Sequence, residues 1–169
     1  MIPIVSVVGT SGIGKTTLLE KLIQELRSRG YRLAAVKHDT HGFDIDHEGK
    51  DSWRLKAAGA NVVVISSPSK MAMIEDTQRD HTLEEIRDRL VGRVDLIISE
   101  GYKREPHPKI EVFRAIRGRG LLCGSDDNLI AVASDVPLDL SVPCIQIDDA
   151  KSLADLIVER FLGDRQAAK

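Results

Sequence analysis

The feature that most constrains the fold is the segment Gly9-Thr10-Ser11-Gly12-Ile13-Gly14-Lys15-Thr16. Its spacing, a glycine, four residues and then Gly-Lys-Thr, matches the phosphate-binding loop (P-loop) fingerprint. Glycine is needed because the backbone must turn tightly enough to aim its N–H groups at phosphate oxygens. A β-branched apolar run (residues 4–8) precedes the loop, and leucines at helical spacing follow it. A strand, a P-loop and a helix in this order predict a nucleoside triphosphate site.

The side chains of this loop have separate predicted roles. Lys15 would reach the β- and γ-phosphates, and the hydroxyl of Thr16 would ligate Mg²⁺. The positive end of the helix that begins here would face the same phosphates. The residues expected to hold the nucleotide from this loop are Gly12, Ile13, Gly14, Lys15, Thr16 and Thr17.

Length and charge exclude several classes of protein. The chain has 169 residues, and we expect residues 1–163 to form one domain and residues 164–169 a flexible tail. With 24 Lys and Arg against 26 Asp and Glu, the formal charge of -2 provides no positive field to attract nucleic acid. The sequence shows neither a secretory signal nor an apolar run long enough to span a bilayer, which predicts a cytoplasmic protein without a membrane partner.

Cys123 and Cys144 share no metal-binding spacing and are interpreted as ordinary thiols.

Strand and helix patterns alternate along the rest of the chain. Strands are expected at residues 4–8, 33–37, 61–66, 71–74, 94–99, 110–113, 129–134 and 144–147, with 61–66 and 71–74 as a possible hairpin. Helices are expected after the P-loop, at residues 52–58 and 86–90, and in the closing segment, and a mobile loop at 115–127. This alternation predicts an α/β protein, a three-layer P-loop NTPase fold with a mostly parallel sheet. Its ligand should lie beyond the carboxyl ends of the strands.

A magnesium–triphosphate site needs an acidic side chain besides the P-loop hydroxyl. Residues 94–100, Val-Asp-Leu-Ile-Ile-Ser-Glu, have the pattern of a buried strand that ends in a carboxylate. We assign the metal ligand to Glu100 rather than Asp95, because the end of a parallel strand faces the ligand crevice and its start lies at the opposite edge. An ordinary acidic residue at a strand end is the alternative interpretation.

A long polar segment, residues 37–51, follows the second expected strand. It leaves the sheet at the carboxyl edge, so Lys37 could contact the γ-phosphate and act with Lys15 in catalysis. His38, His41 and His47 stand in this segment among four aspartates and a glutamate. They could bind a divalent metal, but their spacing has no definite zinc geometry, and a solvated charged loop is the other interpretation.

The sequence contains no Asn-Lys-x-Asp motif for reading guanine. Asp135, directly after the expected strand at 129–134, could take that role. Its carboxylate can accept hydrogen bonds from guanine N1–H and from the exocyclic amine, a pattern that adenine does not offer. A turn-forming aspartate ahead of Val136-Pro137 explains the same residue equally well.

Together these segments resemble the MobB-type family, the molybdopterin-guanine dinucleotide biosynthesis adapter proteins. The resemblance covers most of the chain and rests on the P-loop and on residues 37–38, 49–52, 58–60, 99–103 and 130–137. It implies a GTP-binding protein with weak intrinsic hydrolysis, a homodimer, that assists the guanylyltransferase attaching GMP to molybdopterin. The implied cofactors are GTP and Mg²⁺, and the implied partners are molybdopterin guanylyltransferase and molybdopterin.

The family belongs to a P-loop class that includes dethiobiotin synthetase. The strand-end acid and glycine of that enzyme resemble Glu100-Gly101, and the lysine that ends its second strand resembles Lys37. By the same similarity, Asp51 is a further candidate ligand for Mg²⁺. Two other functions stay open: a small-molecule kinase or ATP-dependent ligase of the dethiobiotin synthetase kind, and a GTPase metallochaperone that uses His38, His41 and His47.

Overall fold

A computed structural model of the chain describes residues 1–40, 42–117, 120–123 and 128–163. The chain divides into two compact units, the first formed by Met1–His38 and Leu83–Lys169 and the second by Asp39–Thr82. That residues 1–163 form a single domain stays a prediction, and the expected tail at 164–169 lies outside the described residues.

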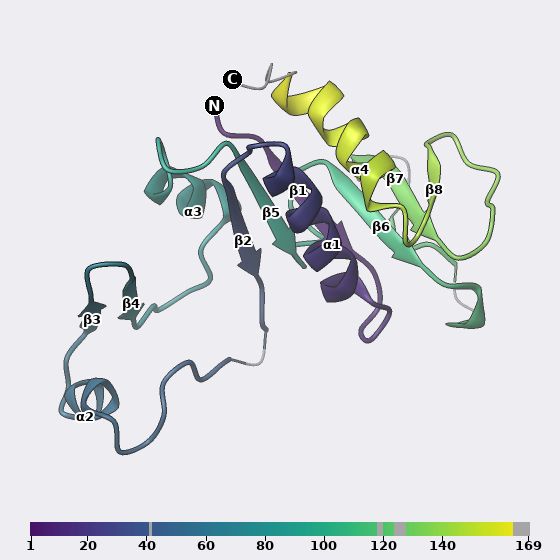
Figure 1. The fold of residues 1–169 in the computed structure, drawn as a ribbon. Coiled ribbons are helices and arrows are strands. Elements are labelled where there is room, and N and C mark those ends of the chain that lie inside the picture. Colours follow the sequence, from purple (N-terminus) through teal and green to yellow (C-terminus); the bar gives the residue numbers. More distant parts are fainter. Residues whose placement is uncertain (41, 118–119, 124–127, 164–169) are drawn as a thin grey trace. The chain divides into compact units, whose positions relative to one another are not determined.

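The first unit is built on a six-stranded sheet in the order β2-β5-β1-β6-β7-β8 (Figure 1). Its strands are β1 (Ile4–Val8), β2 (Leu33–Lys37), β5 (Leu96–Glu100), β6 (Lys109–Phe113), β7 (Leu129–Ser134) and β8 (Cys144–Gln146). Every neighbouring pair is parallel. All carboxyl ends therefore lie at one edge of the sheet, and the P-loop leaves from β1 between β5 and β6.

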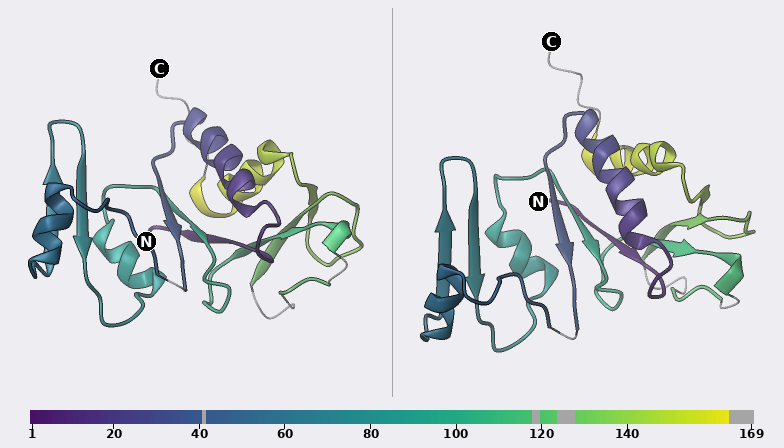
Figure 2. Two further views of the ribbon diagram at one scale, coloured as in Figure 1. Left: turned by 90° about the horizontal axis from the view of Figure 1, so that it is seen from below. Right: turned by 60° about the horizontal axis from the view of Figure 1, so that its bottom comes forward.

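Helices cover both faces of this sheet, as the views in Figure 2 show. They are α1 (Lys15–Ser28), α3 (Leu83–Arg89) and α4 (Ala150–Ile157), the last continuing as a π-helical turn, η2 (Val158–Leu162). Successive strand side chains point to opposite faces. Val5 therefore packs in one core cluster with Leu22 of α1, and Ile4 in another with Leu83 of α3. These layers confirm the expected α/β fold.

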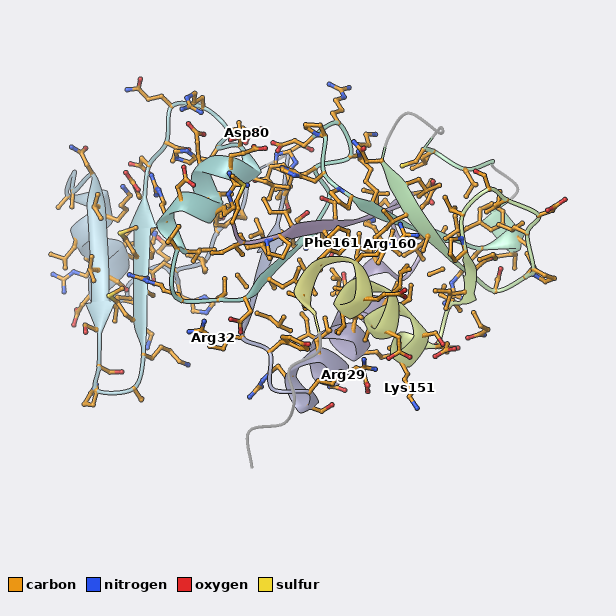
Figure 3. The ribbon with its side chains drawn as sticks, turned by 90° about the horizontal axis from the view of Figure 1, so that it is seen from above. Arg29, Arg32, Asp80, Lys151, Arg160 and Phe161 are labelled. Atoms are coloured by element: carbon orange, nitrogen blue, oxygen red, sulfur yellow. The ribbon has the colours of Figure 1, made fainter. Side chains whose placement is uncertain are left out.

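Arg29, at the C-terminal end of α1, ties this helix to α4 (Figure 3). Its guanidinium binds Glu25 within α1, with Nη2 2.7 Å from Oε1. It also donates to Asp155 Oδ1 at 2.6 Å and to the Lys151 carbonyl at 3.3 Å. The helix whose first turn carries Lys15 and Thr16 is thus held at its far end by two hydrogen bonds from Arg29 to α4.

The second unit contains α2 (Asp51–Ala57) and an antiparallel hairpin of β3 (Val62–Ser66) and β4 (Met71–Glu75). The hairpin predicted from the sequence is confirmed. Lys56 ties the helix to it, because its Nζ donates to the carbonyl groups of Ala60 and Asn61 at 2.9 and 3.0 Å and to Asp76 at 2.5 Å.

Several expected elements differ from the structure by one residue at an end, and larger differences occur at α3, which begins at Leu83 instead of residue 86, at β5 and in the segment 115–127. β5 runs from Leu96 to Glu100 instead of 94–99. Residue 95 precedes the strand, where its carboxylate accepts from the Arg32 N–H and its own N–H donates to the Arg32 carbonyl. The segment expected as a mobile loop contains a short 3₁₀ turn, η1 (Ala115–Arg117), while 118–119 and 124–127 lie outside the described residues. Among the described residues, no helix is both long and apolar enough to cross a membrane.

Candidate nucleotide-binding site

The P-loop backbone takes conformations that favour glycine. Gly9, Gly12 and Gly14 have φ values of 144°, 69° and 104°. At Gly9 the space is also closed, because an added Cβ would lie 2.8 Å from the carbonyl oxygen of Val112 in β6. The loop therefore packs directly against the neighbouring strand. Helix α1 begins at once behind it, with the Leu18 N–H donating to the Gly14 carbonyl at 3.0 Å.

Lys15, Thr16 and Glu100 come together in front of this loop. The Thr16 hydroxyl donates a hydrogen bond of 2.9 Å to Glu100 Oε2. Lys15 Nζ donates to the Thr10 carbonyl at 3.1 Å and lies 4.0 Å from Glu100 Oε1. The side chains of Lys15 and Glu100 are only 14% and 16% exposed. The Thr16 hydroxyl and the Glu100 carboxylate are thus adjacent, and both are hard oxygen ligands of the kind that Mg²⁺ prefers. The pair therefore fits this ion.

Glu100 is held in place by the chain on both sides of it. In the sheet its Cα pairs with Val7 of β1 and with Lys37 of β2. The next residue, Gly101, has φ 99°, and a Cβ there would meet the His38 Cβ at 3.1 Å. The His38 ring stacks on Tyr102, with centroids 4.4 Å apart. Any larger residue at position 101 would push this stack away from the strand end, so the Glu-Gly pair has a steric reason.

Lys37 lies at the same edge of the sheet as Glu100, as the sequence predicted for the end of the second strand. The two residues are Cα partners in the register of β2 with β5, and Lys37 is exposed. The rejected alternative, Asp95, lies at the opposite end of β5, where it accepts from the backbone N–H of Arg32 at 2.8 Å. Glu100 and Asp95 therefore lie at opposite ends of the strand, as predicted from the sequence.

Arg114 is a site residue that the sequence analysis missed. It directly follows β6, and its Nε donates to the carbonyl oxygen of Ile13 in the P-loop at 3.0 Å. A Cβ on Gly14 would lie 3.6 Å from Nη2, so the guanidinium covers the loop. The available signal was its position: a cation directly after a strand expected to be parallel and central lies at the carboxyl edge.

Asp135 follows β7 at the same edge. Its Oδ1 accepts a hydrogen bond of 2.9 Å from the Ala115 N–H, and its Oδ2 lies 3.9 Å from Arg114 Nη1. The carboxylate therefore links the ends of β6 and β7 and supports the arginine that contacts the P-loop. These contacts give Asp135 a local structural role, and its contact with a base stays a prediction.

The remaining candidates divide between the second unit and the P-loop itself. Asp51 opens α2 in the second unit, and His47 belongs to that unit too, so their predicted metal roles stay predictions. His41 lies outside the described residues. Thr17 is exposed on the first turn of α1, whereas Ile13 is buried with 4% exposure, so Ile13 contributes its backbone to the loop and its side chain to the core.

Comparison with known proteins identifies the family. Residues 4–135 match the model of MobB, described as molybdopterin guanine dinucleotide synthesis protein B. The chain belongs to this family. The MobB match spans every strand-end residue described above, from the P-loop through Glu100 and Arg114 to Asp135, so the carboxyl edge of the sheet lies inside it. The resemblance stated from the sequence is confirmed.

Individual MobB relatives match over nearly the whole chain. The molybdopterin-guanine dinucleotide biosynthesis adapter protein of Escherichia coli (strain K12) is 42% identical over 163 residues, covering 94% of this chain and 93% of the relative. The protein of the same name from Haemophilus influenzae is 38% identical over 168 residues, covering 97% and 94%.

Solved MobB structures share the fold. A crystal structure of molybdopterin-guanine biosynthesis protein B superposes with a TM-score of 0.73 at 30% identity, covering 92% of this chain and 98% of the other. Bacillus subtilis MobB gives a TM-score of 0.75 at 28% identity, covering 95% and 99%.

Proposed function

We propose that this chain is an adapter protein of molybdopterin-guanine dinucleotide biosynthesis that binds GTP with Mg²⁺, hydrolyses it slowly and assists a molybdopterin guanylyltransferase. Membership of the MobB family and the names of the relatives support the adapter role. The observation that carries the nucleotide role is the hydrogen bond from Thr16 to Glu100, with Lys15 beside it at the mouth of the P-loop.

Each residue of the site has a distinct part in this proposal. Thr16 Oγ1 and the Glu100 carboxylate would hold the magnesium ion, which would neutralise charge on the phosphate oxygens when bound. Lys15 would replace its contact with the Thr10 carbonyl by one with the β- and γ-phosphates, and the loop N–H groups would bind the same oxygens. Arg114 would keep the loop in shape through Ile13.

Slow turnover is expected because fast P-loop hydrolases position the attacking water with a dedicated side chain, often glutamine. Of the glutamines described in the first unit, Gln24 lies within α1. Gln146 ends β8, where its side-chain oxygen accepts from the Asp148 N–H. Neither follows a strand adjacent to the P-loop, so this part of the molecule supports nucleotide binding better than rapid hydrolysis.

A nucleotide competition tests the proposal. A fluorescent GTP analogue is displaced by GTP or by ATP, with and without Mg²⁺, and turnover is measured on the same samples. We expect GTP to compete better than ATP, Mg²⁺ to strengthen binding, and turnover to be slow. Association with a molybdopterin guanylyltransferase is then measured with and without GTP. Rapid hydrolysis by the chain alone, or failure to associate with that enzyme, would remove the support for an adapter.

The proposal includes a homodimer, supported by the hairpin of the second unit. β3 and β4 form a two-stranded sheet, a structure that is marginal in water by itself. Apolar side chains are exposed on both of its strands, namely Val62, Val64, Ile65, Met71 and Met73. Open sheet edges with exposed apolar side chains favour pairing with another chain, here a second copy.

Light scattering after size exclusion tests the dimer. Val64 and Met73 are directly opposed in the hairpin register and are each 54% exposed. Val64→Lys combined with Met73→Lys should give a monomer. The control is Val91→Lys, which adds a charge at a residue of the first unit that is 68% exposed, and it should leave the mass unchanged. A wild-type monomer at micromolar concentration would contradict the proposal.

A second candidate is a small-molecule kinase or ATP-dependent ligase. The pairing of Lys37 with Glu100 favours it, because a second cation at this edge could contact the same phosphate as Lys15. Consumption of ATP that depends on an added acceptor would support this activity. A strong preference for GTP without any such acceptor would count against it.

A further inference from the structure

A second group of metal-ligating side chains lies apart from the P-loop. It consists of Glu84 in α3 and of Glu105 and His107 in the connection from β5 to β6. One ligand atom from each lies within 4.8 Å of the others. All three residues belong to the first unit. None of them takes part in the contacts described for the nucleotide site, so the group needs its own explanation.

The central atom is Nε2 of His107. It lies 3.0 Å from Glu84 Oε1 and 3.4 Å from Glu105 Oε2, and the His107 side chain is only 12% exposed. Nevertheless this nitrogen is buried and makes no hydrogen bond to any residue that the structure describes. The short distances and the missing hydrogen bond are compatible if neither oxygen lies in the direction in which the proton or lone pair of the nitrogen points, which is in the plane of the ring.

These distances are compatible with a bound ion. Zinc binds imidazole nitrogen and carboxylate oxygen at roughly 2.0–2.2 Å, so two ligands at tetrahedral or right angles around it lie roughly 3.0–3.4 Å apart. Each neighbouring ligand is then off the nitrogen–metal axis by roughly 35–45°. An imidazolium in a plain ion pair would instead aim its N–H at one of the oxygens, since a buried donor without an acceptor is costly.

We propose that Glu84, Glu105 and His107 form a binding site for a divalent transition-metal ion, Zn²⁺, with the remaining coordination positions open to water. The mixed set selects against Mg²⁺ and Ca²⁺, which take oxygen ligands, and suits an ion that accepts imidazole. This site is separate from the predicted magnesium position at Thr16 and Glu100 and does not depend on nucleotide.

The surroundings hold one of the ligands, Glu105, in position. Glu105 Oε2 also accepts a hydrogen bond of 3.3 Å from the Leu83 N–H, at the start of α3. Lys109 Nζ donates to the Glu105 carbonyl at 2.8 Å. Outer contacts of this kind orient metal ligands. A bound ion would therefore fasten α3 to the connection that begins directly after Glu100.

Zinc titration of the full chain, stripped with a chelator and free of nucleotide, tests the site. Calorimetry should give one tight Zn²⁺ per chain, and Zn²⁺ should raise the melting temperature because it binds only the folded state. Glu84→Gln and His107→Ala should each weaken binding by roughly 100-fold or more. His47→Ala, which removes an exposed histidine of the second unit, should bind as the wild type does.

Circular dichroism checks that each variant folds. If His107→Ala does not fold, Glu84→Gln still tests the site, because the Glu84 side chain is 42% exposed. Absorption of bound Co²⁺ should show a low-symmetry site that the same two substitutions abolish. The proposal is overturned if the wild type binds no stoichiometric Zn²⁺, if Glu84→Gln binds it unchanged, or if His47→Ala abolishes it. None of these results alters the outcome of the GTP competition.

Discussion

The hydroxyl of Thr16 donates a hydrogen bond of 2.9 Å to Glu100 Oε2 across a separation of 84 residues. One partner belongs to the first turn of α1 and the other to the end of β5. The bond is possible because β1 and β5 are parallel neighbours, which places the P-loop and Glu100 at the same edge of the sheet. It joins the two oxygen donors that a magnesium–nucleotide site requires.

Lys15→Ala should weaken nucleotide binding. The substitution removes a charge-assisted phosphate contact of about 1.5–3 kcal/mol, which corresponds to roughly tenfold or more in affinity. Titration with a fluorescent GTP analogue measures the effect. Lys21→Ala is the control, because Lys21 is a lysine of α1 that pairs with Asp148 at 2.6 Å, and it should bind GTP normally. Equal affinities for the Lys15 variant and the wild type would exclude the P-loop assignment.

Glu100→Gln should reduce the dependence of nucleotide binding on Mg²⁺. The amide keeps the size of the side chain and an oxygen that can accept from Thr16, but it lacks the charge that attracts the ion. GTP affinity is compared with and without Mg²⁺. Asp95→Asn makes the same chemical change at the other end of β5 and should keep the full response. If GTP binding by the Glu100 variant kept its full dependence on Mg²⁺, we would assign the metal ligand to Asp51 instead.

Arg114→Ala should raise the Kd for GTP by roughly fivefold, the equivalent of about 1 kcal/mol for one partly exposed hydrogen bond. The bond lost is the one from Nε to the Ile13 carbonyl. Arg114→Lys should not restore affinity, because a point charge cannot reproduce the fork that spans Ile13 and Asp135. The matched control is Arg32→Ala, an arginine paired with Asp95 away from the loop. Full affinity in both Arg114 variants would show that the arginine is dispensable for the loop.

Gly9→Ala should destabilise the protein by more than Gly30→Ala. Both glycines have positive φ, 144° and 87°, so each substitution strains the backbone. At Gly9 the new Cβ also meets a backbone oxygen, that of Val112 at 2.8 Å, whereas at Gly30 no atom of the described residues lies within 4 Å of it. Overpacking of this kind adds about 1–3 kcal/mol. Denaturant unfolding measures the free energy of unfolding of both variants. If both lost the same amount, the P-loop would be able to move away from β6 without cost.

The cap of α4 should add to acid sensitivity. The pKa of Asp149 is held below its usual value because its carboxylate accepts hydrogen bonds from the Ser152 hydroxyl and then from the Ser152 N–H. A lowered folded-state pKa means that this contribution is complete above the unfolded pKa of about 3.9 and is lost as pH falls below it. Asp149→Asn keeps a capping oxygen but does not titrate there. Its melting temperature should approach that of the wild type below about pH 4, and a constant difference would argue against the cap as the cause.

Several features were predictable because their information is local. The P-loop spacing, the apolar runs of the strands and the leucines of α1 predicted the strand–loop–helix unit and the alternating α/β order. Glu100 could be preferred to Asp95 because the end of a parallel strand is known to face the ligand. The contact of Arg114 with Ile13, 101 residues apart, was not predicted, because it depends on which strand lies next to β1.

The sequence by itself thus determined the P-loop, the helix behind it and the parallel character of the sheet, since these follow from backbone stereochemistry and side-chain periodicity over a few residues. Only the tertiary structure decided the strand order, and with it that Thr16 meets Glu100, that Asp135 supports Arg114, and that Glu84 lies beside His107. No spacing encodes these pairs. They exist because the burial of two sheet faces brings distant segments to the same edge or face.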